Sequence, residues 1–194
     1  MKKHFIYTEG DLGHIPYGFV VLDTGIFVHG ALGDGHCIRI LYSQGDSDLR
    51  FGFPRGVEKE AKRVLEREYE SRGLKWLLKQ LDKEFININV QRRFYPPHCG
   101  WISRLEMSDV DKDIIKLCLM DNTECVVSKD LKDIVHNPTL RSALHNNYQL
   151  PKEKVFTPEE FCEEYNSKLV PYRLWDKLGT KWRTFKDRPW GKNR

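Results

Sequence analysis

The stretch YGFVVLDTGIFVHG, residues 17–30, decides which fold the sequence predicts. Two apolar runs rich in β-branched and aromatic residues, YGFVVL and IFVHG, flank the three residues Asp23, Thr24 and Gly25. Strong β-formers around a short loop that ends in glycine are typical of a β-hairpin, because glycine adopts the left-handed conformation without steric cost. Both arms are apolar on both faces, so we expect this hairpin to be central in an antiparallel sheet.

Further segments with alternating or short apolar patterns extend the predicted sheet. They are CIRILY (37–42), LRFGF (49–53), FININVQRRF (85–94), WISRLEM (101–107) and a second hairpin formed by IIKLCLM and CVV (114–127).

Two regions have helical signals. Residues 57–83 repeat apolar side chains at helical spacing, and Ser71-Arg72-Gly73 predicts a break between two helical segments. In FTPEEF, residues 156–161, Thr157 is an expected N-cap and Glu160 completes a capping box. Phe156 and Phe161 have the spacing of a hydrophobic staple.

The sequence therefore predicts an α+β fold: a mostly antiparallel sheet with a kinked helix on one face, then a small hairpin and a C-terminal helical appendage. We expect residues 1–107 to form the α+β core, with its helix at about 57–83. Residues 108–150 are expected to add a hairpin and short helices to that core, and residues 151–194 a capped helix and a basic, aromatic tail.

The composition of the 194 residues indicates a protein of the cytoplasm. No apolar run approaches the length of a membrane span, and the first residues lack the apolar stretch of a secretory signal. The five cysteines are widely spaced and form no CxxC pair, which favours reduced thiols over disulfides. We expect no cofactor and no membrane association.

The positive charge is concentrated at the end of the chain. Residues 177–194 hold seven Lys or Arg and one Asp, a net +6, so the first 176 residues sum to −2 because the whole chain is +4. Cations neutralise phosphates, and aromatic rings between them can stack on unpaired bases. The predicted binding residues, for nucleic acid or a protein partner, are Lys181, Trp182, Arg183, Phe185, Lys186, Arg188, Trp190, Lys192 and Arg194, extended by Arg92 and Arg93.

From this tail we predict a non-enzymatic binding protein that contacts nucleic acid, RNA or DNA, or a nucleoprotein complex. The alternative is a protein-interaction factor, an inhibitor or an assembly subunit, whose tail docks on an acidic protein surface. A tail packed on the protein itself stays open as well, because Trp175 and Trp182 have a spacing that suits a buried helix.

A third hypothesis is a small hydrolase that uses the loop GDGHC, residues 33–37. This loop resembles the Asp-Gly-Asn-Cys motif of ovarian-tumour-type cysteine proteases, with His36 in place of the Asn. The resemblance implies Cys37 as the nucleophile, with Asp34, His36 and His98 as further candidates. Those proteases begin a helix at the cysteine, whereas CIRILY predicts a strand, so we predict no catalytic residue and expect Cys37 to pack in the core.

Three other patterns lack decisive residues. FGFPRGVEKEAKRVLEREYESRGL, residues 51–74, resembles the Nudix box in Arg67-Glu68, but Ser71-Arg72 replaces the paired glutamates that hold metal. Glu60-Ala61-Lys62 resembles a nuclease Glu-x-Lys pattern but falls in a predicted helix, where pairing of Glu58 with Lys62 explains the lysine better. Two His-Cys dipeptides, at 36–37 and 98–99, have no zinc-site spacing, so we predict no metal site.

Overall fold

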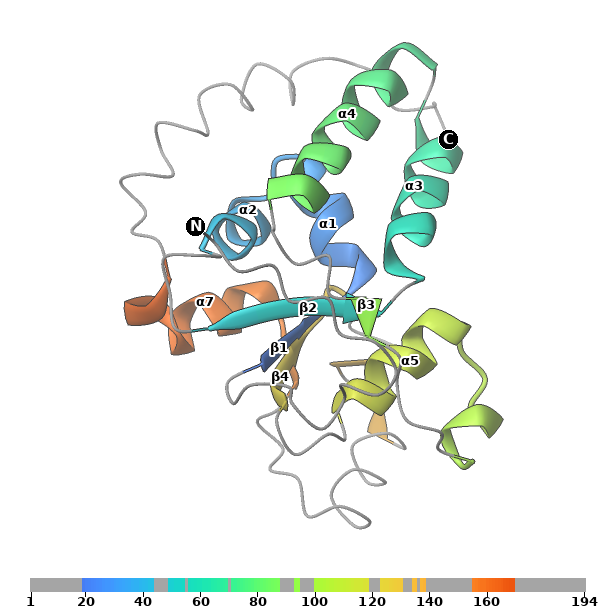
Figure 1. The fold of residues 1–194 in the computed structure, drawn as a ribbon, viewed down its shortest axis with the longest axis vertical. Helices are drawn as coiled ribbons and strands as arrows, with labels where there is room; N and C mark the ends of the chain where they lie inside the picture. Colours follow the sequence, from blue (N-terminus) through green and yellow to red (C-terminus); the bar gives the residue numbers. More distant parts are fainter. Residues whose placement is uncertain are drawn as a thin grey trace.

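The computed structural model describes residues 19–43, 49–54, 56–69, 71–87, 93–94, 100–118, 123–130, 134–135, 137–138 and 155–169. Five strands form one sheet in the order β3-β2-β1-β4-β5, and every neighbouring pair is parallel (Figure 1). The strands are β1 (Phe19–Leu22), β2 (Arg50–Pro54), β3 (Arg93–Phe94), β4 (Thr123–Val127) and β5 (Val155–Phe156). The fold class is therefore α/β, and the prediction of a mostly antiparallel sheet is wrong.

Helices cover both faces of this sheet. On one side, α1 to α4 lie together above the strands, and α5 lies on the other side (Figure 1). The helices are α1 (Thr24–Ala31), α2 (Gly35–Tyr42), α3 (Val57–Glu68), α4 (Ser71–Asn87), α5 (Asp109–Cys118) and α7 (Pro158–Glu164), with 3-10 turns at η2 (Ile102–Arg104) and η5 (Asn166–Lys168).

The predicted central hairpin is a strand followed by a helix. YGFVVL contains β1, as expected, but Asp23 is the N-cap of α1 and IFVHG lies inside that helix. The helix is buried on nearly all sides, with Ile26 and Phe27 fully inaccessible. An apolar run buried all round has no helical stripe, so its periodicity cannot be told from that of a buried strand.

The same error affects other predicted strands. CIRILY lies in α2, in which the residues from Cys37 to Leu41 are all buried. Even Arg39 is only 2% exposed, and it donates hydrogen bonds to Asn166. IIKLC belongs to α5, so CVV in β4 follows a helix and not the first arm of a hairpin. WISRLEM contains a 3-10 turn, and residues 85–87 of FININVQRRF end α4, whereas 88–92 lie outside the described residues.

Several local predictions are confirmed. LRFGF supplies all of β2 except Pro54. The 57–83 region forms two helices, although the break lies between Glu68 and Ser71, before the predicted position. Thr157 and Glu160 form the expected capping box of α7. The rings of Phe156 and Phe161 meet edge to face with centroids 6.3 Å apart, as a staple requires.

The core has two layers because β1 and β4 alternate their side chains across the sheet. Val20, Leu22 and Val127 pack under the helices α1 to α4 and α7, whereas Val21 and Val126 pack against α5. In the described segments no helix has the length and apolar character needed to cross a membrane. Strands from all three predicted segments of the chain share the one sheet, and the boundaries at 107 and 150 stay predictions.

Candidate functional site

The strand order places a crevice at the carboxyl edge of the sheet. From β1 the chain proceeds to β2 on one side and later returns to β4 on the other side of β1. In open parallel sheets, ligands bind beyond the carboxyl ends of two strands that separate in this way. Asp23 directly follows β1, and Lys129 and Asp130 follow β4, so polar side chains occupy this position.

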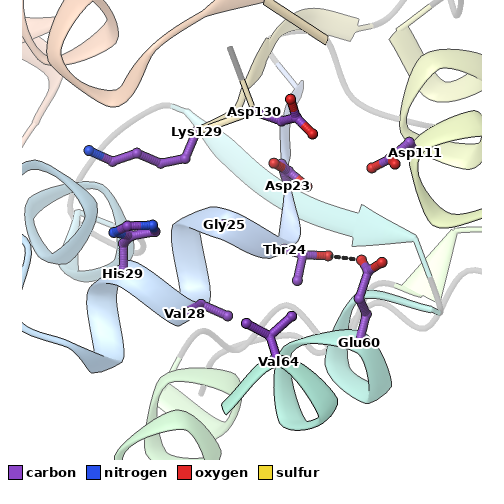
Figure 2. Close-up of a pocket in the computed structure, with 10 residues that line it drawn as sticks. All are labelled: Asp23, Thr24, Gly25, Val28, His29, Glu60, Val64, Asp111, Lys129 and Asp130. Carbon is purple, nitrogen blue, oxygen red and sulfur yellow. Dashed lines mark hydrogen bonds between the residues drawn. The ribbon is translucent and has the colours of Figure 1, made fainter. Parts of the chain in front are cut away.

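A pocket of about 560 Å³ opens there, within the range of small-molecule sites. Figure 2 shows four carboxyl groups on one side of it and His29 with the amino group of Lys129 on the other. The lining residues are Asp23, Thr24, Gly25, Val28, His29, Glu60, Val64, Asp111, Lys129 and Asp130.

Asp23 is the most buried of the four acids, at 4% exposure. Its Oδ2 accepts a hydrogen bond of 2.6 Å from Ser128 Oγ. Burial, together with the charges of Asp111 and Glu60, raises the pKa of Asp23 to about 7, and the Ser128 hydrogen bond opposes this shift. The Asp23 carboxyl is therefore poised to lose its proton near neutral pH when a cation stabilises the charged form.

Neighbouring hydroxyl groups orient the other carboxylates. Thr24 Oγ1, in the first turn of α1, donates a 2.5 Å hydrogen bond to Glu60 Oε2 of α3. Ser108 Oγ donates to Asp111 Oδ2 at 2.8 Å and accepts from the Asp111 backbone, which caps α5. Burial raises the pKa of Asp111, and the nearby charges of Glu60 and Asp130 add to the rise. The carboxylates are thus close enough for the charge of one to raise the pKa of another.

Ser128 connects two of the acids. The same Oγ that donates to Asp23 accepts a 2.9 Å hydrogen bond from the backbone N–H of Asp130. The loop after β4 is therefore fixed against the end of β1, and Asp130 is held at the pocket.

Two close approaches bring these elements together. A Cβ on Gly25 would lie 2.9 Å from Lys129 Cβ, so glycine lets α1 begin directly beside the loop after β4. A Cβ on Gly56, the N-cap of α3, would collide with Val110 Cγ2 of α5. Because Glu60 and Asp111 lie in the first turns of those two helices, the contact of Gly56 with Val110 places their carboxylates at one pocket.

Lys129 points away from the four acids (Figure 2). Its Nζ lies 2.9 Å from Asp34 Oδ2 and 2.9 Å from Glu159 Oε1. Burial lowers the pKa of Lys129, but the hydrogen bonds to Glu159 and Asp34 outweigh it and the net shift is upward. Burial and the charge of Lys129 lower the pKa of His29.

Ligand atoms of Asp34, His36 and Glu159 lie within 4.8 Å of one another, the one such trio in the described residues. Lys129 already supplies a positive charge between Asp34 and Glu159, so a metal ion here would displace its amino group. The four pocket carboxylates do not close to that distance. Mg²⁺ keeps several waters and needs one or two direct carboxylates, so their wider spacing suits a hydrated ion.

The residues of the GDGHC loop are structural or peripheral in this arrangement. Asp34 caps α2, accepting from the backbone N–H groups of His36 and Cys37 at 3.0 and 3.1 Å. Cys37 is fully buried, as predicted, although in a helix and not a strand, and burial raises its thiol pKa. A nucleophilic cysteine needs an accessible thiolate, so these features argue against that role. His98 lies outside the described residues.

The predicted tail residues 181–194 and Arg92 also lie outside the described residues, whereas the Arg93 backbone belongs to β3. Their role stays a prediction. Lys62 pairs with Glu58 at 3.0 Å, as predicted, while Glu60 turns to the pocket.

Sequence reasoning missed the pocket acids, yet a signal for them exists. In VVLD an acidic residue directly follows a short, fully apolar run, and in CVVSKD an acidic residue follows such a run by three positions. Taken as parallel strands, these runs bring Asp23 and Asp130 to one edge of the sheet. Taken as hairpin arms, they do not. Comparisons of the chain with protein-family models, curated proteins and solved structures give no match.

Proposed function

We propose that the chain is a divalent-cation-dependent phosphodiesterase that cleaves nucleic acid strands. One observation carries the proposal: four carboxylates from four separate segments converge on one pocket at the carboxyl edge of the sheet. They are Asp23, Glu60, Asp111 and Asp130.

A cation is the simplest ligand for such a pocket. Burial is the main cause of the raised pKa values of Asp23 and Asp111, and the charges of neighbouring carboxylates add to the rise. Mg²⁺ and Mn²⁺ prefer carboxylate and water oxygens, and Mg²⁺ in proteins commonly binds phosphate substrates. The donor set therefore fits a hard divalent ion better than zinc, which favours thiolate and imidazole ligands.

The chemistry that fits this donor set is hydrolysis of a phosphate ester. A bound divalent ion supplies a Lewis acid and a water of lowered pKa. The water oxygen would form a bond to phosphorus while the bond from phosphorus to the leaving ester oxygen breaks. The water proton goes to solvent, and the leaving oxygen takes a proton from solvent. In this scheme one or two of Glu60, Asp111 and Asp130 would contact the ion directly and the others through its waters, with Asp23, fixed by Ser128, at the buried end.

A nucleic acid substrate would account for both the carboxylate pocket and the predicted tail. Seven Lys or Arg and the aromatic residues of 177–194 suit a phosphate backbone and its bases. The predictions of a non-enzymatic nucleic-acid binder, of a protein-docking factor and of a hydrolase centred on GDGHC stay untested. Among them we favour nucleic-acid contact, with the carboxylate pocket as the reacting centre.

The test is strand cleavage with a matched pair of variants. End-labelled single-stranded RNA and DNA are incubated with the full chain in Mg²⁺, in Mn²⁺ and in EDTA. Asp111→Asn removes a pocket carboxylate, whereas Asp109→Asn removes a 99% exposed carboxylate from the same turn of α5. We expect cation-dependent cleavage that falls roughly 100-fold or more in Asp111→Asn and is unchanged in Asp109→Asn.

Equal rates in the two variants, or cleavage that persists in EDTA, would assign the activity to another site or to a contaminant. Failure to cleave any single- or double-stranded RNA or DNA with Mn²⁺ would contradict the proposal. Cation binding without cleavage would favour the second candidate, a protein whose cation only bridges it to nucleic acid.

A further inference from the structure

The face of α3 that borders the pocket carries an ordered set of side chains beyond Glu60. Helical residues at i, i+3, i+4 and i+7 share one face, and from Glu60 these positions are Arg63, Val64 and Arg67. Glu60 and Val64 line the pocket, and Arg63 and Arg67 are exposed. Over about 10 Å of helix, this face therefore changes from a carboxylate to an apolar side chain flanked by two cations.

We propose that this face binds the nucleotides next to the cleaved phosphate of a single-stranded nucleic acid, an inference that rests on the proposed function. The cleaved phosphate lies at the carboxylates, the adjoining sugar and base pack on Val64, and the next phosphates contact Arg63 and Arg67. We call Glu60, Arg63, Val64 and Arg67 the α3 face.

The apolar part of the pocket supports a packed sugar or base. Val28 of α1 is 6% exposed, and it lines the pocket together with Val64. Figure 2 shows these two side chains next to each other, on the wall away from Asp111 and Asp130. A site for a hydrated cation alone has no use for an apolar wall, whereas a nucleotide presents both a charged and an apolar part.

The distribution of charge on α3 selects the same side. Lys62 lies two residues from Glu60, so it projects from the opposite side of the helix. There it pairs with Glu58 at 3.0 Å and with Asp82 of α4 at 3.1 Å, which neutralises that side. Arg67 is 75% exposed, and its Nε lies 3.0 Å from Glu68 Oε1. By helical spacing, the exposed arginines lie on the same face of α3 as the pocket residues Glu60 and Val64, where an anionic strand would approach.

The experiment compares two double variants of equal charge. Arg63→Gln with Arg67→Gln changes the α3 face. Lys75→Gln with Lys79→Gln removes two exposed cations from α4. This helix lies on the side of α3 away from the α3 face, where Lys62 pairs with Asp82. Fluorescence anisotropy measures binding of a labelled 12-nucleotide single strand in EDTA over a series of salt concentrations, so the result does not depend on cleavage.

For the α3-face variant we expect about tenfold weaker binding at low salt and a logarithmic salt slope smaller by about 1.4, since each phosphate contact in a single strand contributes about 0.7. The α4 variant should bind like the unchanged protein. Val64→Ala should weaken binding without a change in slope, because an apolar contact releases no counterions.

Equal weakening in both double variants would overturn the proposal, since only net charge would then matter. Stronger competition by an acidic peptide than by the single strand would also overturn it and favour a protein as the occupant. A stability increase on adding Mn²⁺ that matches the unchanged protein shows that the variants keep the pocket. If binding follows the α3 face but no variant or condition gives cleavage, the proposed function fails and the strand-binding face stands.

Discussion

The amino group of Lys129 lies 2.9 Å from Asp34 Oδ2, and this contact joins the loop after β4 to the loop before α2. The same amino group contacts Glu159 of α7 at 2.9 Å. Because Lys129 lies between Ser128 and Asp130, its contacts help to fix the loop that carries one of the pocket acids. The GDGHC loop thus supports the pocket from outside.

Asp34→Asn isolates this ion pair from the helix cap. Asparagine caps a helix as well as aspartate does, so the variant keeps the hydrogen bonds to the α2 backbone but loses the charge. Both side chains of the pair are 22% exposed. We therefore expect a loss of about 1 kcal/mol or less in the free energy of unfolding, measured with urea. Asp34→Ala should lose about 1 kcal/mol more, because the cap disappears too. Equal losses in the two variants would contradict this division.

Asp23→Asn should stabilise the protein at alkaline pH. Asp23 has a pKa of about 7 in the folded chain against an ordinary value of 3.8, so the folded chain holds this proton more tightly than the unfolded chain. Stability therefore falls as pH rises from about 4 to 7, by at most roughly 3–4 kcal/mol. Asn avoids this cost and can still accept from Ser128. In thermal melts, the melting temperature of Asp23→Asn should lie above that of the unchanged protein at pH 8 and close to it at pH 4. The difference for Asp109→Asn should not change with pH in this way.

Divalent cations should bind more tightly as the pH rises to about 7. A cation needs the charged form of Asp23, so below the pKa of about 7 a proton competes with it. Titration with Mn²⁺, followed by calorimetry or by the rise in melting temperature, should show affinity falling with each pH unit below 7 and levelling above it. In Asp23→Asn this dependence should weaken markedly. A flat profile in the unchanged protein would remove Asp23 from the cation site.

Local signals predicted the elements whose pattern depends on neighbouring residues alone. The capping box of α7 and the amphipathic helix α3 have one wet face and defined ends, so their sequences are sufficient. Most residues of α1 and the run from Cys37 to Leu41 in α2 are buried, and these runs are mostly apolar. Their β-branched and aromatic residues then favour strands, and only the tertiary packing decides for helix.

The prediction missed the pocket acids because of that one error, the assignment of IFVHG to a strand. With IFVHG as a strand, Asp23 is a turn residue of a hairpin; with IFVHG as a helix, it stands at the carboxyl end of β1. Glu60 and Asp111 are 51 residues apart in sequence, and nothing local relates them. They meet only because Gly56 allows α3 to contact α5, a long-range packing that a single sequence does not display.

Gly56→Ala tests whether this contact sets the geometry of the pocket. Gly56 has a φ of −73°, which alanine also adopts, so the expected cost comes from the collision with Val110 and from a weaker N-cap. We expect a loss of about 1–3 kcal/mol in unfolding free energy and weaker Mn²⁺ binding, because α3 must move and carry Glu60 away from Asp111.

Gly100→Ala is the control, since nothing lies within 4 Å of its new methyl group. Combining Gly56→Ala with Val110→Ala removes the collision, so the double variant should regain Mn²⁺ affinity and lose less stability than the two single changes added together. Additive losses, with Mn²⁺ affinity unaffected throughout, would show that the pocket does not depend on this contact.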